Sequence, residues 1–158
     1  EIDAQEIEKI AISSTKIRNS INQGDLETTK KYLGRFFSLT GKVVKGDGLG
    51  KQIDYPTANI LIEEDYKIIP KDGVYYIRTT IDNKLYNGMM NIGHRPTIGN
   101  KAKSIEVNLF NFDRDIYDKI ISIDVVVKIR DEKKFSSINA LKAQLAKDEE
   151  HCLKLINK

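Results

Sequence analysis

The sequence predicts a mainly β fold, a six-stranded antiparallel barrel with a C-terminal α-helix, preceded by a short helical segment. From residue 38 onward, segments rich in Val, Ile, Tyr and Thr alternate with turn-forming residues. No amphipathic helical pattern lies between these segments, which argues against βαβ units. Short strands in unbroken succession are typical of antiparallel sheets that close into a small barrel. The predicted strands are 39–45, 58–63, 73–81, 84–92, 104–112 and 121–129.

A hairpin signal and a helix signal complete this pattern. Asp82-Asn83 separates two of the predicted strands and is typical of a tight hairpin turn. After the last strand, apolar residues recur at helical spacing, with Ser136 or Ser137 as the N-cap and Phe135 placed to pack against the first turn. We therefore expect a C-terminal helix that packs on the barrel. Its apolar stripe is Ile138, Leu141, Leu145, Cys152, Leu153 and Ile156.

Residues 1–36 have a different pattern, in which isolated Ile and Leu residues lie among charges at roughly helical spacing. One of the hydroxyl residues 13–15 would cap a helix over 16–22, and Asp25 would begin a second helix that ends near Gly34. This segment has too little apolar content to form a core of its own. We therefore expect residues 1–36 to be a helical remnant of a preceding module, followed by a main domain over 37–158.

The composition fits one globular domain with a short extra segment. The 158 residues are 40% hydrophobic and 31% charged, which is enough apolar content for a core. The net charge of +3 requires neither nucleic acid nor a membrane as a partner. A single cysteine, Cys152, excludes an intramolecular disulfide and favours a reducing, cytoplasmic location. The N-terminus has no apolar run long enough for a signal peptide or a membrane span. Because the first residue is Glu1 and not Met, we expect a piece of a longer protein or a processed chain.

A glycine-rich segment follows the first predicted strand. Gly46, Gly48 and Gly50 alternate with other residues, so that backbone N–H groups could approach an anion closely. Lys51 adds a positive charge suited to phosphate. The spacing is not that of a Walker A loop, and the position between strands excludes a Rossmann fingerprint. A flexible loop between strands is the alternative interpretation.

A second motif, Pro56-Thr57-Ala58-Asn59, begins the next predicted strand. Alternation along a strand places Thr57 and Asn59 on the same side of the chain. Their hydroxyl and amide oxygens could hold Mg²⁺, which prefers oxygen ligands and keeps several waters. The alternative is a strand start in which Thr and Asn only cap a turn.

Two further groups of residues could take part in chemistry. Glu106 lies in a strand of branched apolar residues, and a carboxylate that faces the ligand mouth of the barrel could act as a general base. An exposed Glu is the alternative. The charged run 130–135 is typical of a solvated loop, but its one aromatic residue, Phe135, would either pack against the helix start or cover a flat ligand. Neither His94 nor His151 has partners at metal-ligand spacing.

Several short motifs follow one another in a fixed order. They are Gly46-x-Gly48-x-Gly50-Lys51, Pro56-Thr57-Ala58-Asn59, Asn91-Ile92-Gly93, Arg95-Pro96-Thr97, Ile105-Glu106-Val107 and Arg130-x-Glu132-x-x-Phe135. In this order they resemble the riboflavin kinase family, specifically the kinase module of bacterial bifunctional riboflavin kinase/FAD synthetases. The resemblance extends from Gly41 to about Asp148. Its most specific part is Pro-Thr-Ala-Asn behind a glycine loop.

The resemblance implies transfer of the γ-phosphate of ATP to the 5′-hydroxyl of riboflavin, which gives FMN, with Mg²⁺ as the cofactor. The residues implied to bind the ATP phosphates are Gly46, Gly48, Gly50, Lys51, Thr57 and Asn59. Thr57 and Asn59 would also hold Mg²⁺, and Glu106 would be the base on the riboflavin hydroxyl. The flavin would be bound from a mobile loop by Arg130, Glu132 and Phe135.

The N-terminal stretch 12–18 resembles the last motif of the adenylyltransferase module that precedes the kinase in such proteins. The resemblance thus implies a covalently linked FAD synthetase module in the full-length protein, and no FAD synthesis by this chain alone. Two alternatives stay open: a non-catalytic barrel that binds nucleotide or single-stranded nucleic acid, and a fragment with an inactive site. Nucleic-acid binding would need aromatics interleaved with a basic groove, a pattern that Tyr75, Tyr76 and Phe110 do not form.

Overall fold

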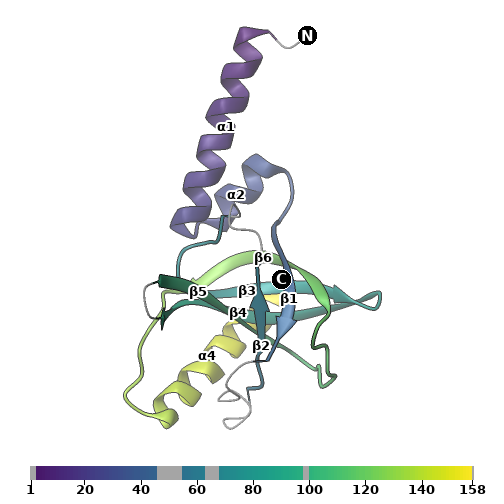
Figure 1. The fold of residues 1–158 in the computed structure, drawn as a ribbon, viewed down its shortest axis with the longest axis vertical. Helices are drawn as coiled ribbons and strands as arrows, with labels where there is room; N and C mark the ends of the chain where they lie inside the picture. The colour runs from purple at the N-terminus through teal and green to yellow at the C-terminus, as the bar shows by residue number, and fades with distance from the viewer. Residues whose placement is uncertain (1–2, 46–54, 63–67, 98–99, 158) are drawn as a thin grey trace.

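The computed structural model describes residues 3–45, 55–62, 68–97 and 100–157. Within these residues, antiparallel strands close into a barrel in the order β1-β2-β5-β4-β3-β6 (Figure 1). This confirms the predicted fold class. The strands are β1 (Phe37–Val44), β2 (Ala58–Leu61), β3 (Gly73–Ile81), β4 (Lys84–Thr97), β5 (Asn100–Leu109) and β6 (Ile120–Arg130).

The longest difference from the predicted strands lies in the β4–β5 pair. The two strands remain paired from Gly88 with Leu109 to Thr97 with Asn100, well beyond the predicted end of the first strand at residue 92. The extra residues are mostly polar, and the hydrogen bonds of a strand ladder do not depend on side-chain polarity. The β3–β4 hairpin agrees with the prediction, since both Asp82 and Asn83 have positive φ, as a tight primed turn requires.

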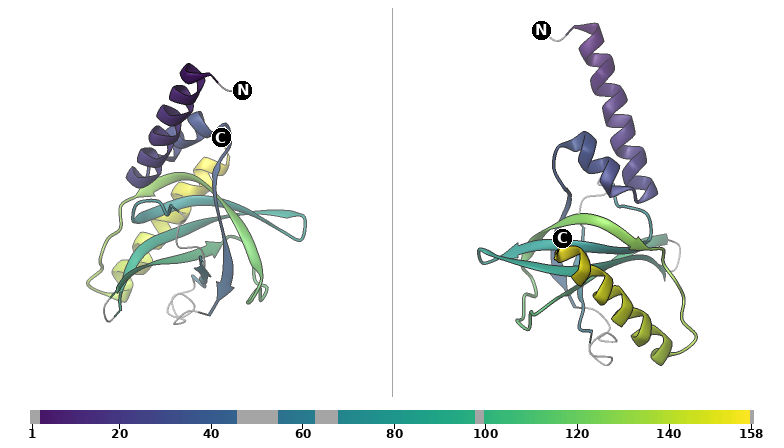
Figure 2. Two further views of the ribbon diagram at one scale, coloured as in Figure 1. Left: turned by 45° about the horizontal axis from the view of Figure 1, so that its top comes forward. Right: turned by 180° about the vertical axis from the view of Figure 1, so that it is seen from behind.

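The barrel has an inner core and a second, outer core. Inward-facing residues such as Val43, Ile77 and Val107 are at most 1% exposed. The outer core comprises Val74, Tyr76 and Met89 together with Cys152 of helix α4 (Ile138–Ile156). Helix α4 therefore covers the outer face of the barrel, where it packs against β4 and β6 (Figure 2).

Helix α4 begins at the predicted residue, but two residues of its predicted apolar stripe do not face the barrel. Ser137 is the N-cap, and its side chain accepts a hydrogen bond from the backbone N–H of Ala140. Cys152 is completely buried, whereas Ile138 and Leu153 of the predicted apolar stripe are 56% and 43% exposed. The apolar residues predicted from helical spacing cover a wider part of the helix surface than the curved barrel can contact.

Helix α1 (Ala4–Gln23) is much longer than predicted and projects away from the barrel (Figure 1). Its N-cap is Asp3, whose carboxylate accepts from the N–H of Glu6, so the expected cap at residues 13–15 is wrong. Thr15 lies inside the helix and donates its hydroxyl to the carbonyl of Ala11 instead. A hydroxyl side chain can satisfy itself in this way within a helix, which removes the need for a cap.

Helix α2 (Leu26–Leu33) begins at the predicted cap, Asp25, and ends at Gly34 in the left-handed conformation. Leu26 is 2% exposed and belongs to the same core cluster as the inward residues of the barrel. Helix α2 contacts β1 and β6, so it closes one end of the barrel. Neither α1, α2 nor α4 is long and apolar enough to cross a membrane.

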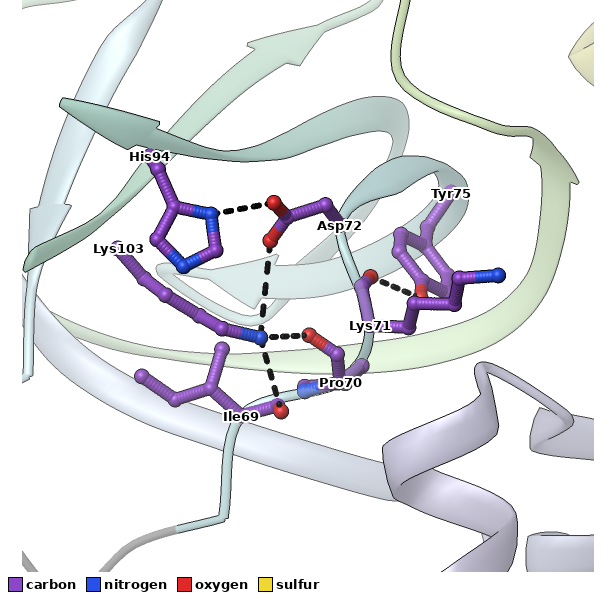
Figure 3. A network of polar contacts seen from close by, with 7 residues as sticks. All are labelled: Ile69, Pro70, Lys71, Asp72, Tyr75, His94 and Lys103. Carbon is purple, nitrogen blue, oxygen red and sulfur yellow. Dashed lines mark hydrogen bonds and ion pairs between the residues drawn. The ribbon is translucent and has the colours of Figure 1, made fainter. Parts of the chain in front are cut away.

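A polar network holds the connection before β3 against the far end of the β4–β5 pair (Figure 3). Asp72 lies between His94 of β4 and Lys103 of β5, forming a close contact with His94 Nδ1 and lying 3.6 Å from Lys103 Nζ. Lys103 also donates to the carbonyl of Pro70 at 2.8 Å. His94 lies beyond the predicted end of its strand at residue 92 but is part of β4. Burial and the charge of Asp72 raise the pKa of the neighbouring Tyr75.

Candidate functional site

A row of polar residues crosses the outer face of the barrel. Asn59 of β2 is paired with Glu106 of β5, and Glu106 is paired in turn with Asn91 of β4. Directly opposite residues in neighbouring strands point to the same face of a sheet. The next residues along, Val107 and Met90, point into the core and are at most 1% exposed. Glu106 therefore faces outward beneath α4, whereas the sequence suggested that it faces the mouth of the barrel.

A first cavity of about 200 Å³ lies between this outer face and α4. It brings together five of the predicted site residues, which are Thr57, Glu106, Arg130, Glu132 and Phe135. The other lining residues are Tyr55, Val74, Met89, Asn91, Asn108, Lys133, Leu141 and Leu145. The cavity thus combines apolar surface with two carboxylates, two cationic side chains, two amides and the hydroxyl of Thr57, a mixture that a small-molecule site can use.

A second cavity, of about 550 Å³, opens at the mouth of the barrel. Val43, Ala58 and Val107 form its inner wall. Its outer residues come mainly from the segment between β5 and β6 and are Leu109, Phe112, Asp113, Arg114, Asp115, Ile116 and Tyr117. Lys45 and Pro56 complete the rim, and Thr57 lines both cavities. Thr57 therefore stands at the point where a molecule in one cavity would meet a molecule in the other.

The predicted phosphate-binding residues are only partly described. Gly46, Gly48, Gly50 and Lys51 lie outside the described residues. The residues on either side of that stretch reach the two cavities, because Lys45 lines the second and Tyr55 lines the first. Asn59 lines neither cavity, but it shares the face of Glu106, to which it is paired.

Local contacts hold the walls of the first cavity in place. The side-chain amide of Asn108, which is 8% exposed, donates to the carbonyl of Pro56 at 2.7 Å and so ties β5 to the Pro-Thr-Ala-Asn motif. A Cβ atom added to Gly93 would come within 2.2 Å of Glu132 Oε1. The Glu132 carboxylate therefore lies directly on the β4 backbone, at a place that only a glycine leaves open.

Sequence reasoning assigned no role to Asn91 or Asn108. Both lie on the outer face beside Glu106, and both line the first cavity. For Asn108 a signal was present, because residues two apart on a strand share a face. For Asn91 no such signal exists, since the pairing of β4 with β5 brings it to Glu106 across fifteen positions of sequence.

Three oxygen-bearing side chains in this region are of the kind that a hard divalent cation prefers. They are the Thr57 hydroxyl just before β2, the Asn59 amide of β2 and the Glu106 carboxylate of β5, which is paired with Asn59. Among the described residues, no group of three His, Cys, Asp or Glu side chains could enclose a metal by itself. Such a donor set suits an ion that keeps waters and shares the oxygens of a phosphate ligand.

Comparison with known proteins gives information on the family of this chain. The sequence model of the flavokinase family, described as riboflavin kinase, matches residues 33–156. The bifunctional riboflavin kinase/FMN adenylyltransferase of Bacillus subtilis is 38% identical over 146 residues, which are 90% of this chain and 46% of that protein. The chain thus spans about half the length of the curated relatives it matches.

Two solved structures share the fold. A macrolide-efflux protein from Streptococcus pneumoniae has a TM-score of 0.82 and 37% identity, over 88% of this chain and 45% of that one. Riboflavin kinase from Trypanosoma brucei has a TM-score of 0.53 and 25% identity, over 77% of this chain and 80% of that one. The efflux name describes a different activity, so the assignment rests on the family match and on the curated relatives. On that ground, the chain belongs to the riboflavin kinase family.

Proposed function

We propose that this chain transfers the γ-phosphate of ATP to the 5′-hydroxyl of riboflavin, producing FMN and ADP. The observation that carries the proposal is the pair of cavities that meet at Thr57, one of which contains the carboxylate of Glu106. A two-substrate transfer requires two adjoining sites with a reactive group at the boundary. Membership of the riboflavin kinase family supports riboflavin and ATP as the two substrates.

The first cavity is suited to the flavin. Met89, Leu141 and Leu145 offer apolar surface, and Phe135 offers an aromatic face, for a flat ring system. Its volume of about 200 Å³ is smaller than the ~300–1,000 Å³ of typical ligand pockets. The segment that carries Glu132 and Phe135 would make room for the flavin, in agreement with the mobile loop that the family resemblance implies.

The second cavity is suited to ATP, with the phosphates directed toward Thr57. Lys45 at its rim, together with the predicted Gly46, Gly48, Gly50 and Lys51, would bind the phosphate oxygens. Thr57 and Asn59 would hold Mg²⁺, whose charge would offset that of the transferred phosphoryl group. Of these two residues, Thr57 is the better-supported ligand, since it lines both cavities and Asn59 lines neither.

Glu106 would act on the riboflavin hydroxyl. Its carboxylate would accept the hydroxyl proton while the ribityl oxygen bonds to the γ-phosphorus and the bond to the β-phosphate oxygen breaks. Arg130 and Glu132 lie on the wall of the same cavity and would orient the flavin by its polar edge. Positioning by these residues supplies most of the rate, since phosphoryl transfer needs little covalent assistance.

We also propose that the full-length protein carries an FMN adenylyltransferase module to which residues 1–36 belong. The support is the bifunctional name of relatives such as that of Bacillus subtilis. Ile7 and Ile10 of α1 are more than half exposed, as expected for a helix that packs against further protein. A cytoplasmic location fits the single cysteine, Cys152.

The test is FMN formation, measured by chromatography after incubation with riboflavin, ATP and Mg²⁺. We expect product that depends on ATP and on the divalent ion, so that EDTA abolishes it and added Mg²⁺ restores it. Mn²⁺ in place of Mg²⁺ tests the identity of the metal. Nucleotide binding without any FMN would contradict the proposal and favour a non-catalytic nucleotide-binding barrel.

A further inference from the structure

Asp148 of α4 is a buried carboxylate that lies behind the wall of the first cavity without lining it. It is 3% exposed, and it is the one charged residue among the buried part of the described chain. A buried carboxylate is costly unless it is paired and hydrogen-bonded. Here both oxygens accept hydrogen bonds, from Arg130 Nε at 2.9 and 3.0 Å and from Gln144 Nε2 at 2.9 Å.

The Asp148 carboxylate fixes the plane of the Arg130 guanidinium. Besides the Nε bonds, Arg130 Nη2 lies 2.8 Å from Asp148 Oδ2, so the two groups meet along a whole edge. A forked pair of this kind sets orientation as well as distance. The opposite nitrogen, Nη1, donates to the carbonyl of Asp131 at 3.1 Å, and the guanidinium carbon lies 5.7 Å from the centre of the Phe135 ring. Arg130 therefore connects α4 to both ends of the segment 131–135.

That segment forms one side of the first cavity. Glu132 and Phe135 line it, and the Glu132 carboxylate rests on β4 at Gly93. Leu141 and Leu145, which lie on α4 with Asp148, line it from the helix side. The position of this wall relative to Glu106 thus depends on how firmly Arg130 is held.

We propose that Asp148 is a positioning residue for flavin binding: it holds Arg130 so that the segment 131–135 closes on the ring. This rests on the function proposed above. Gln144 supports the same arrangement by satisfying one Asp148 oxygen. The second cavity is lined by none of these residues, so ATP binding does not depend on them.

A purely structural role for Asp148 gives a different result. If the pair only fastened α4 to the barrel, its loss would reduce stability and affect both substrates alike. A positioning role raises the KM and the dissociation constant for riboflavin, while the KM for ATP stays unchanged. The comparison of the two substrates therefore separates the two roles.

The test is Asp148→Asn, which keeps the shape but removes the charge and one acceptor for Arg130. We expect the riboflavin KM and dissociation constant to rise about tenfold, and the ATP KM to change by less than about twofold. Riboflavin affinity is read from the quenching of its fluorescence, and both KM values from FMN formation. Gln144→Met, which leaves the ion pair intact, should raise the same riboflavin constants by about threefold.

Glu150→Gln is the matched control, because Glu150 is an exposed carboxylate on the same helix that pairs with Lys154 at 3.6 Å. It should leave both substrates unaffected. If Asp148→Asn lacks the circular dichroism of the parent protein, the riboflavin and ATP constants of Gln144→Met test the positioning role instead. An unchanged riboflavin affinity, or an equal rise in both KM values, overturns the positioning role. A parent protein that makes no FMN counts against the proposed function alone, because riboflavin binding still reports on Asp148.

Discussion

Two adjacent residues of β5, Glu106 and Val107, show how strand alternation separates chemistry from packing. Val107 points into the barrel and is 1% exposed, whereas Glu106 points outward and is only partly buried. A carboxylate inside the barrel would lose its hydration among apolar side chains. On the outer face it lies in a row with Asn59 and Asn91. The strand thereby presents a candidate base without disturbing the core.

Glu106→Gln tests that base. The substitution keeps the shape of the side chain and removes its basicity, so both substrates should still bind. We expect kcat to fall by a factor of about 10² to 10⁴, the range attributed to general base catalysis. Single-turnover FMN formation with both ligands saturating measures it. A near-normal rate would leave Glu106 at most a positioning residue.

Gly93→Ala tests the contact between β4 and the segment that follows β6. The added methyl group would meet the end of the Glu132 side chain, which is flexible and can turn away. Stability should therefore change by less than about 1 kcal/mol, while the riboflavin KM rises because the Glu132 carboxylate leaves the cavity wall. Thermal unfolding and steady-state kinetics measure the two effects.

The double variant Gly93→Ala/Glu132→Ala is the control for this interpretation. If the methyl group acts only by displacing Glu132, the double variant should be no worse than Glu132→Ala alone. Additive losses in riboflavin affinity would show that Gly93 matters for another reason.

At the scale of elements, the tip of the β3–β4 hairpin supports the segment that walls the second cavity. Asp82 Oδ2 accepts from Arg114 Nη1 at 2.9 Å and lies 3.6 Å from Lys119 Nζ. The hydrogen bond from Arg114, followed by the charge of Lys119, lowers the pKa of Asp82 below its usual value. A turn that looks like a simple chain reversal therefore also anchors the β5–β6 connection.

Asp82→Asn should reveal this anchor through its pH dependence. Asn tolerates the positive φ of the turn, so the variant removes mainly the charge. Because the folded-state pKa is lowered, the stabilisation is fully present above the unfolded pKa and is lost as the pH falls through the folded one. In urea unfolding, the parent should be more stable than the variant at pH 7, and this difference should disappear as the pH falls below the folded-state pKa of Asp82.

Salt provides the check on this prediction, because Asp82 is exposed and its ion pairs are screened. The difference in stability between the parent and Asp82→Asn at pH 7 should shrink in about 1 M NaCl. A parent-to-variant difference that stays constant with pH would contradict the ion-pair explanation.

At the scale of the molecule, the helices before the barrel are joined to it unequally. Leu26 of α2 is part of the barrel core, and Ile21 near the end of α1 is 3% exposed. The remainder of α1 is largely exposed, and Ile7 and Ile10 are each more than half exposed to solvent. The predicted boundary at residue 36 stays a prediction, but the packing shows that α2 contributes to the stability of the barrel.

Two truncated chains test this difference. A chain that starts at Ser20 keeps Ile21, Leu26 and the buried hydrogen bond between Ser20 and Thr29, and should match the parent in activity and melting temperature. A chain that starts at Arg35 loses the Leu26 contact and should be less stable by at least about 2 kcal/mol, while still making FMN. Loss of activity in a folded chain starting at Ser20 would show that α1 belongs to the kinase.

Much of this architecture follows from local sequence alone. Several features that depend on only a few neighbouring residues agree with the structure. They are the alternation of side chains along strands, the turn at Asp82-Asn83, and the helix caps at Asp25 and Ser137. The segment 13–15 misled because a hydroxyl residue serves equally well as a cap or inside a helix. The polar ends of β4 and β5 were missed because main-chain pairing, not side-chain pattern, extends them.

The sequence by itself determined the barrel, the C-terminal helix and the identity of Thr57, Glu106, Arg130, Glu132 and Phe135 as site residues to be tested. Only the tertiary structure decided that Glu106 lines the first cavity under α4, that Thr57 lines both cavities, and that Asp148 forms an ion pair with Arg130. The reason is physical. Strand periodicity specifies which residues share a face, but closure of the barrel and the packing of α4 decide what that face meets.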